Sequence, residues 1–201
     1  MIKLVVFDMG GVMIRDFHMA DGLMPFLGYE PGTSFSSIGE ELTEMLKAHG
    51  RGEISENDFW VRYEEITGRH VEEWRHESLF GRFFHPYLDD DTVQVVKDLK
   101  ARGWRVVCGT DVIDAHYKYH MDNHQYDVFD KVYASHLIHI KKPSTEFFRY
   151  IADAEGVETD EMFFTDDYPP NIESAASLGV KVHLYENAGK LRKALEDLGL
   201  L

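Results

Sequence analysis

Five short apolar runs, most of them rich in β-branched residues, constrain the fold more than any other feature of the sequence. They are residues 2–7 (IKLVVF), 104–109 (WRVVCG), 131–135 (KVYAS), 162–165 (MFFT) and 180–185 (VKVHLY). Helix-like patterns separate the later runs. Continuous apolar strands joined by crossover helices are typical of a parallel sheet covered on both faces. The sequence therefore predicts an α/β fold.

Three helices are expected between the later strands. Asp91 and Gln94 resemble a capping pair that opens a helix running through Leu99. A second helix begins at PSTEFF and ends at Gly156, and one of its faces is apolar. That face contains Phe147, Phe148, Ile151 and Ala152. A third, short helix covers residues 171–179 (NIESAASLG) and is closed by its final glycine.

The segment from residue 15 to residue 89 breaks this alternation because it contains no convincing strand. Helical patterns occupy residues 38–50, 55–68 and 71–84, and the second of these opens with Ser55 and an acid three positions later. We interpret the segment as a helical insert that follows the first strand. Such an insert would lie over the carboxyl ends of the strands, where open α/β sheets bind ligands. The alternative is a helical excursion with no role in a site.

The charge balance and the single cysteine limit the possible partners and compartments. The chain has 201 residues, 21 Lys and Arg against 36 Asp and Glu, and a formal net charge of −15. An acidic chain without a basic run repels nucleic acid and anionic lipid, so neither is expected as a partner. Cys108 cannot form an internal disulfide, and the first residues are too few for a signal peptide or a membrane span. We expect a cytoplasmic protein, whose oligomeric state stays open.

Polar side chains stand where several of the predicted strands end. In chain order they are Asp8, Thr110, Lys142 and the pair Asp166 and Asp167. A carboxylate at the end of the first strand is well placed to be a nucleophile or a metal ligand. Glycines at positions 10 and 11 would let backbone groups approach a ligand closely. The alternative is that Asp8 only caps a turn.

Together these segments resemble the haloacid dehalogenase superfamily. The stretches VVFDMGGV, VVCGTD, KKP and FFTDDYPPNIESAASLG are similar to its four motifs, in order and at plausible spacing. RGEIS and FTDDYPPNIESA resemble the small phosphatase-like members, which carry a helical cap after the first strand. The resemblance implies a Rossmann-like core with helices on both faces, formed by residues 1–14 and 90–201, and an all-helical cap formed by residues 15–89.

The resemblance also implies a reaction: Mg²⁺-dependent transfer of a phosphoryl group, through an aspartyl-phosphate, from a small phosphorylated metabolite. Asp8 would attack phosphorus and Lys142 would neutralise charge. Thr110 would bind a phosphoryl oxygen, with Gly11, Asp111 and Lys142 also contacting the substrate. The metal ligands would be Asp8, the Gly10 carbonyl, Asp166 and Asp167, with Asp167 binding directly or through water. Carboxylate and carbonyl oxygens are ligands that Mg²⁺ prefers.

Two positions depart from the family pattern. Phosphatases of the family commonly carry a second aspartate two residues after the nucleophile as general acid and base, but position 10 is glycine. Asp111 stands where asparagine is expected, and its charge would oppose a phosphate unless it is protonated or turned away. Asp16, His18 and Asp111 are the nearest candidates to replace the missing acid.

Other functions remain open from the sequence alone. One is a metal-independent dehalogenase-type hydrolase, in which the aspartate displaces halide from carbon. The other is a catalytically weak binding or regulatory module that keeps the fold. His116, His120 and His124 recur at four-residue spacing, which we interpret as a solvent-facing helix surface rather than a zinc site.

Overall fold

The five apolar runs form one parallel sheet with strand order β5-β4-β1-β6-β7. The computed structural model describes all residues, 1–201. The strands are β1 (Leu4–Phe7), β4 (Arg105–Thr110), β5 (Lys131–Ala134), β6 (Met162–Asp166) and β7 (Lys181–Leu184). Each strand falls on one of the predicted runs, so the parallel sheet is confirmed.

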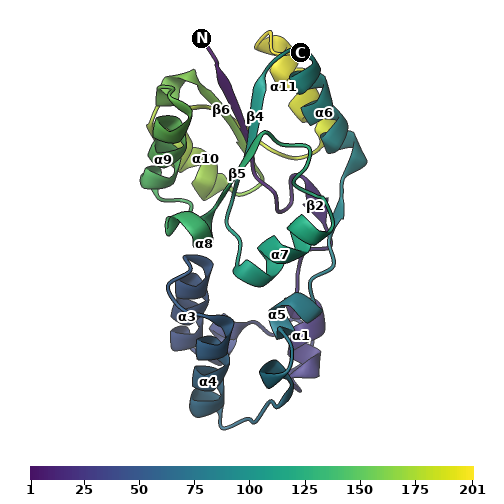
Figure 1. Cartoon of the computed structure of the whole chain (residues 1–201), viewed down its shortest axis with the longest axis vertical. Helices are drawn as coiled ribbons and strands as arrows, with labels where there is room; N and C mark the ends of the chain where they lie inside the picture. Colours follow the sequence, from purple (N-terminus) through teal and green to yellow (C-terminus); the bar gives the residue numbers. More distant parts are fainter.

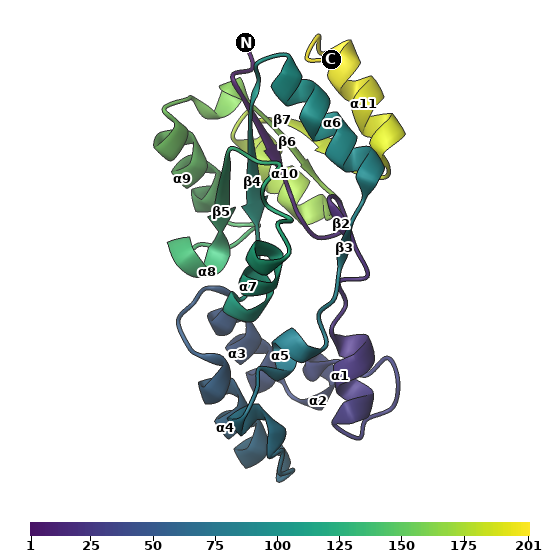
Figure 2. The ribbon, with the colours of Figure 1, turned by 45° about the vertical axis from the view of Figure 1, so that its right-hand side comes forward.

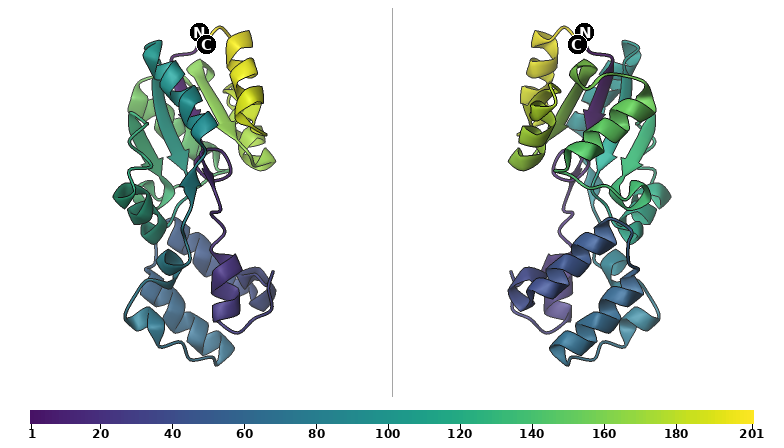
Figure 3. Two further views of the ribbon diagram at one scale, coloured as in Figure 1. Left: turned by 90° about the vertical axis from the view of Figure 1, so that its right-hand side faces the viewer. Right: turned by 90° about the vertical axis from the view of Figure 1, so that its left-hand side faces the viewer.

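Helices cover both faces of this sheet (Figures 1 and 3). Because successive side chains of a strand point to opposite faces, Val5 and Phe7 pack in one apolar cluster while Leu4 and Val6 pack in another. The first cluster lies under α6 (Asp90–Ala101) and α11 (Ala188–Asp197), and the second under α9 (Thr145–Glu155) and α10 (Pro169–Ser177). The predicted α/β class with a Rossmann-like core is confirmed.

The remaining elements of this core are short or differ from expectation at their ends. They are α7 (Asp114–Asp122), α8 (Ser135–Ile138) and the 3₁₀ turn η2 (Thr159–Glu161). Helix α6 is capped by Asp89, whose carboxylate accepts a hydrogen bond from the Thr92 N–H at 2.9 Å. The expected cap at Asp91 is therefore wrong, and Gln94 instead donates to Asp98 one turn later. A run of three aspartates leaves the capping position ambiguous in the sequence.

The chain between β1 and α6 forms the helical insert, which lies beyond the carboxyl ends of the strands (Figure 2). It contains α1 (Ala20–Phe26), α2 (Phe35–Ile38), α3 (Glu40–Gly50), α4 (Glu56–Thr67), the 3₁₀ turn η1 (Glu73–Arg75) and α5 (Leu79–Arg82). Ser55 and Asp58 form the expected capping box of α4. The continuous helix expected over residues 71–84 is wrong, because the chain there makes only η1 and α5.

The insert has an apolar core of its own. Its buried residues are Leu23, Met24, Leu27, Phe35, Leu42, Phe59, Trp60, Tyr63, Val71, Leu79 and Phe80. The aromatic rings of Phe59, Trp60 and Phe80 lie 5.1–5.2 Å apart, a spacing that favours edge and tilted packing. None of the helices in the chain has the length and apolar content needed to cross a membrane.

A two-stranded ribbon joins the insert to the sheet. Strands β2 (Ile14–Arg15) and β3 (Tyr87–Leu88) pair antiparallel, with Ile14 opposite Leu88. No strand was expected here, since a two-residue strand is too short to show periodicity. The ribbon holds side by side the two segments through which the chain enters and leaves the insert.

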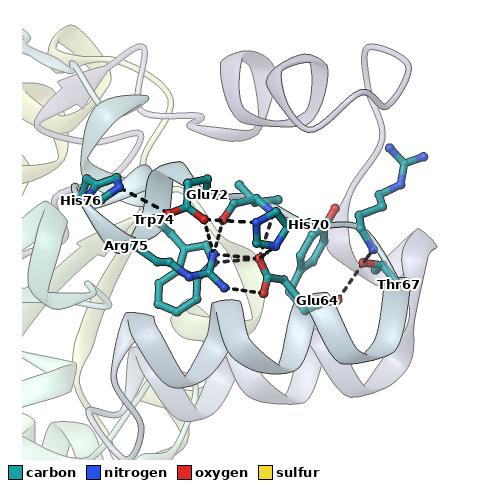
Figure 4. A network of polar contacts seen from close by, with 10 residues as sticks. Glu64, Thr67, His70, Glu72, Trp74, Arg75 and His76 are labelled. Carbon is teal, nitrogen blue, oxygen red and sulfur yellow. Dashed lines mark hydrogen bonds and ion pairs between the residues drawn. The ribbon is translucent and has the colours of Figure 1, made fainter.

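One partly exposed carboxylate, that of Glu64, organises the far end of the insert (Figure 4). Glu64, on α4, accepts hydrogen bonds from the Val71 N–H at 2.9 Å, from Trp74 Nε1 at 3.2 Å and from Arg75 Nη2 at 2.9 Å. These contacts hold residues 70–75 across α4 in a path that is not α-helical. They explain why the expected helix over residues 71–84 is interrupted. Hydrogen bonding from Arg75 lowers the pKa of Glu64 to about 2.

We expect Glu64→Ala to lower the free energy of unfolding by about 1–3 kcal/mol, because it leaves the Val71 and Trp74 donors without their acceptor. The matched control is Glu65→Ala, whose side chain is exposed and pairs only with Arg62, so a change within about 0.5 kcal/mol is expected. Urea denaturation measures both. Since the pKa of Glu64 is depressed, its contribution is present above its ordinary pKa and is lost as the pH falls toward 2. A difference between wild type and Glu64→Ala that does not shrink on acidification would contradict this assignment.

Candidate active site

Asp8 lies at the carboxyl end of the central strand β1. Its backbone N–H donates to the Thr165 carbonyl of β6 at 3.0 Å, so the strand pairing continues to this residue. The chain then turns sharply, and the Met9 carbonyl accepts from the N–H groups of both Met13 and Ile14. The turn ends in β2. The carboxylate is therefore fixed at the edge where the sheet faces the insert.

A single buried ammonium group bridges two strand-end carboxylates. Lys142 Nζ donates to Asp8 Oδ1 at 2.6 Å and to Asp166 Oδ2 at 2.7 Å. Its third hydrogen bond goes to the Gly109 carbonyl of β4 at 3.1 Å. An ammonium group has three donors, and all three are used here. Only 5% of Lys142 is exposed, so the pairing takes place away from bulk water.

Burial and pairing act against each other in this triad. Burial raises the pKa of the Asp8 carboxyl, an effect that Lys142 opposes and the charge of Asp166 reinforces. Burial alone would lower the pKa of Lys142, but the charges of Asp8 and Asp166 reverse that effect and hold it above its ordinary value. The ammonium therefore keeps its charge, and a second cation beside Asp8 would further favour the ionised carboxylate.

Asp166 is fully buried and held on several sides. Besides Lys142, it accepts from the Tyr168 N–H at 2.8 Å and from Asn171 Nδ2 at 2.9 Å. Asn171 lies on α10 in the first turn after the double acid. The sequence pattern did not single out Asn171, although an amide so close after an acid pair is a usable signal. Asp167, the second acid, is exposed.

The three carboxylates form a cluster that suits a hard cation. Asp8, Asp166 and Asp167 each offer an oxygen, and these oxygens all lie within 4.8 Å of one another. The Gly10 carbonyl oxygen accepts no hydrogen bond from the protein. Oxygen ligands of this kind fit Mg²⁺ better than softer ions such as Zn²⁺, which favours sulfur and nitrogen.

The two glycines after Asp8 have different structural roles. Gly11 has φ of +71°, and a Cβ there would lie 2.1 Å from Asp167 Oδ2. Its missing side chain makes room for the second acid. Gly10 does not have a positive φ, and a Cβ there would meet only the Phe17 ring at 3.5 Å, an ordinary contact. The structure thus requires glycine at position 11 and not at position 10.

Thr110 and Asp111 follow one another at the end of β4. Thr110 is buried and lines the same cavity as Asp8. Asp111 Oδ1 accepts from the Lys142 backbone N–H at 3.0 Å, and its other oxygen lies 3.8 Å from Lys141 Nζ. Burial raises the pKa of Asp111. The carboxylate is directed toward the loop that carries Lys142, which resolves how an acid fits beside the hydroxyl.

Arg15 supports the loop after Asp8, a role that sequence reasoning missed. Its Nη1 donates to the carbonyl oxygens of Gly11 at 2.9 Å, Val12 at 3.1 Å and Ile14 at 2.9 Å. Its Nη2 lies 3.0 Å from Asp89 Oδ2. Together with a hydrogen bond from Nη2 to the Tyr185 hydroxyl at 3.0 Å, these contacts fix the turn and tie it to the start of α6. Sequence alone offered no signal for them, since they depend on how the turn folds.

A cavity of about 540 Å³ lies between the strand ends and the insert. The residues expected at the site all line it except Gly11, which faces Asp167 instead. Of the candidates for a replacement acid, His18 and Asp111 line the cavity and Asp16 does not. The other lining residues are Met9, Ile14, Phe17, Met19, Ala20, Phe84, Val112, His116, His120, Tyr168 and Asn171.

The histidines of α7 do not form the solvent-facing surface expected from their spacing. His120 is only 2% exposed, and His116 stacks on Phe84 with ring centroids 3.6 Å apart. Both line the cavity, whereas His124 is exposed beyond the helix end. The expectation is wrong because α7 packs between the sheet and the insert. The helix face that carries His116 and His120 is therefore covered and does not face solvent.

The chain is an α/β protein with a parallel sheet and a cluster of acids at the strand ends, and the sequence comparison identifies its family. Residues 2–179 match the haloacid dehalogenase-like hydrolase family. The chain therefore belongs to the haloacid dehalogenase-like hydrolases, as its four motifs predicted.

Curated relatives are similar at modest identity. The sesquiterpene phosphatase astK of Aspergillus oryzae is 28% identical over 92% of this chain and 91% of its own length. A chloroplast flavin mononucleotide hydrolase of Arabidopsis thaliana is 38% identical over 60 residues, and the drimenol cyclase drtB of Aspergillus calidoustus is 30% identical over 71 residues. The chain matches only 24% and 13% of the lengths of these last two proteins.

Solved structures share the whole fold. A haloacid dehalogenase-family enzyme of Bacteroides thetaiotaomicron, in complex with magnesium and inorganic phosphate, superposes with a TM-score of 0.73 at 24% identity, covering 95% of this chain and 99% of that one. A hydrolase of Porphyromonas gingivalis gives 0.74 at 21% identity and covers 98% of each chain. At these identities the likeness concerns the fold.

The glycine pair provides a test of the loop geometry. We expect Gly11→Ala to destabilise the protein by about 1–2 kcal/mol, the cost of a left-handed conformation for an L-residue, and to displace Asp167. Gly10→Ala is the matched control and should change the free energy of unfolding by less than about 0.5 kcal/mol. Denaturant unfolding and calorimetric Mg²⁺ titration measure the two effects. Equal losses in both variants would show that the loop conformation differs from the one described.

Proposed function

We propose that this hydrolase is a Mg²⁺-dependent phosphatase that cleaves the phosphate ester of a small phosphorylated metabolite through an aspartyl-phosphate on Asp8. The observation that carries the proposal is the bridge from Lys142 to Asp8 and Asp166, beside the acid at position 167. It supports a site in which an oxygen nucleophile, a fixed positive charge and a set of oxygen ligands share one end of the cavity.

The chemistry follows from these groups. An oxygen of Asp8 attacks phosphorus, the ester P–O bond breaks, and the leaving oxygen takes a proton. Water then cleaves the acyl phosphate, which releases inorganic phosphate and restores the carboxylate. Lys142 offsets the negative charge of nucleophile and phosphoryl group, and the Thr110 hydroxyl donates to a phosphoryl oxygen. Asp111 lines the phosphate end of the cavity, and Gly11 makes room behind it for Asp167.

Asp8, the Gly10 carbonyl, Asp166 and Asp167 would hold the metal ion. When bound, Mg²⁺ supplies positive charge beside the phosphoryl oxygens and turns the repulsion of three acids into attraction for the substrate. The phosphatase name of the Aspergillus oryzae relative and the magnesium and phosphate in the Bacteroides structure support this assignment. A metal-independent dehalogenase is disfavoured, since displacement of halide has no use for two further acids beside the nucleophile.

We also propose the domain division that the sequence suggested. Residues 1–14 and 90–201 form the catalytic core, and residues 15–89 form a cap over its site. The separate apolar core of the insert and the ribbon at its base support this division. The partner is a small molecule that enters between cap and core.

Metal binding should be detectable without turnover. We expect millimolar Mg²⁺ to raise the melting temperature of the chelated wild-type protein. The rise should be larger at pH 8 than at pH 5.5, since burial raises the pKa values of Asp8 and Asp167 and protons compete with the cation.

Asp8→Asn, which keeps the shape but removes the attacking charge, should abolish turnover with little loss of stability. Activity that survives strong chelation, or a phosphoenzyme formed by Asp8→Asn, would refute the mechanism.

Because position 10 carries no acid, we expect the rate of hydrolysis to depend steeply on the leaving group of the ester. We expect aryl and acyl phosphates to react far faster than alkyl esters, because their leaving oxygens need little protonation, and phosphoenzyme to accumulate in a burst. Gly10→Asp should narrow this difference, since general acid–base help is worth about 10²–10⁴-fold and the position has room for a side chain. Gly10→Asn is the matched control. A flat dependence in wild type that becomes steep in Asp111→Asn or His18→Gln would show that another residue supplies the proton.

A further inference from the structure

Negatively charged side chains outnumber lysine and arginine in the lining of the cavity. Its acids, at positions 8, 111, 166 and 167, lie at the strand ends, and its only Lys or Arg side chain is Lys142. All three donors of that ammonium are already used within the protein. Arg15 is close in sequence but donates to the turn behind Asp8 and does not line the cavity. A substrate with a second anionic group would therefore meet no free lysine or arginine side chain in the cavity.

The remaining wall of the cavity is mostly apolar or aromatic, with the two imidazoles of α7 among its side chains. Phe17, Met19, Phe84 and Val112 line it, together with His116 and His120. At about 540 Å³ the cavity is large enough for a leaving group of several atoms beyond the phosphate.

The hydrogen bonds of His120 fix which of its nitrogens carries the proton. Gln125 Nε2 donates to the Pro86 carbonyl at 2.9 Å, so the amide oxygen of Gln125 faces the imidazole. That oxygen lies 2.6 Å from His120 Nδ1. Since an amide oxygen only accepts, Nδ1 carries the hydrogen, and Nε2 of the neutral ring is left as an acceptor.

His116 is fixed in the same way. Its Nε2 lies 3.2 Å from the Phe80 carbonyl and must donate to it, which leaves Nδ1 as the acceptor. Neither free nitrogen makes a hydrogen bond in the protein, and neither is among the fully enclosed polar atoms that lack a partner. Burial lowers the pKa of both rings, that of His116 to about 3. At neutral pH the two imidazoles are uncharged and can accept but not donate at these positions.

We propose that the substrate's leaving group is uncharged and carries a hydroxyl or N–H group, which donates to His116 Nδ1 or His120 Nε2 while the rest packs on the apolar wall. The inference rests on the proposed phosphatase function and narrows its substrate class. No unpaired lysine or arginine is left in the cavity for a second anion, and the two acceptors favour an alcohol-like or amide-like donor. Gln125 is a positioning residue, because its amide oxygen holds His120 in the tautomer that leaves Nε2 as an acceptor.

Matched small esters test the proposal. With Mg²⁺ present, 2-hydroxyethyl phosphate should show a kcat/KM about tenfold or more above both phosphoglycolate, which replaces the hydroxymethyl group by a carboxylate, and propyl phosphate, which replaces the hydroxyl by a methyl. In His116→Phe and His120→Phe the ratio of 2-hydroxyethyl to propyl ester should fall toward one. His124→Asn, outside the cavity, is the control and should keep the ratio.

A binding arm separates this inference from the proposed function. Calorimetry with 3-hydroxypropylphosphonate, butylphosphonate and 3-phosphonopropanoate, which cannot be hydrolysed, should give the same order of affinity. Preference in binding without turnover of any ester would refute the phosphatase and support only the preference of the cavity for an uncharged hydrogen-bond donor. Turnover with equal or better use of phosphoglycolate or propyl phosphate would refute the inference and leave the phosphatase standing. A wild-type preference that both His→Phe variants retain would also overturn it.

Discussion

The rest of the site depends on one buried ammonium group. Lys142 reaches β1, β4 and β6 at once, through Asp8, the Gly109 carbonyl and Asp166. Two buried carboxylates on neighbouring strands would repel each other strongly without it, because charges removed from water need a partner. Removing the ammonium would therefore leave two uncompensated charges at the centre of the sheet. The pair of acids can stand at the strand ends only because the loop before α9 places a cation between them.

The same loop that positions Asp8 also attaches the insert. Gly11 bends the chain away so that the carboxylate of Asp167 fits behind it, and Arg15 holds the turn through three carbonyl oxygens. Arg15 is itself in β2, the first arm of the ribbon that leads into the insert. A displacement of the insert that strained the ribbon would therefore be felt at the residues beside the nucleophile. The geometry of the site and the attachment of the insert therefore depend on the same short loop.

The sequence predicted what depends on local pattern and failed where contacts between distant segments decide. Apolar runs located all five parallel strands, and strand-end polarity pointed to Asp8, Thr110, Asp166 and Asp167. Lys142 was expected at a strand end as well, but it lies in the loop between α8 and α9. The ribbon β2–β3 escaped notice because two-residue strands have no period. The expected helix over residues 71–84 does not form as one element, because hydrogen bonds from Val71 and Arg75 to Glu64 hold the chain across α4. His116 and His120 were misjudged because burial of α7 comes from the insert, which no local pattern reveals. The roles assigned to the site residues and the domain boundaries stay predictions.

The cavity divides its chemistry between two ends. At the strand ends, acids and one ammonium suit a phosphoryl group with a hard cation. Elsewhere in the lining, two imidazoles are fixed by the carbonyl of Phe80 and the amide of Gln125, and each keeps one nitrogen as a free acceptor. Such rings cannot protonate a leaving oxygen, and Gly10 offers no acid either. Under the proposed function, this chain therefore commits its aromatic wall to recognition and not to proton transfer. A leaving group that binds well there must obtain its proton from His18, Asp111 or water, so tight recognition and fast release of the alcohol are separate demands on this site.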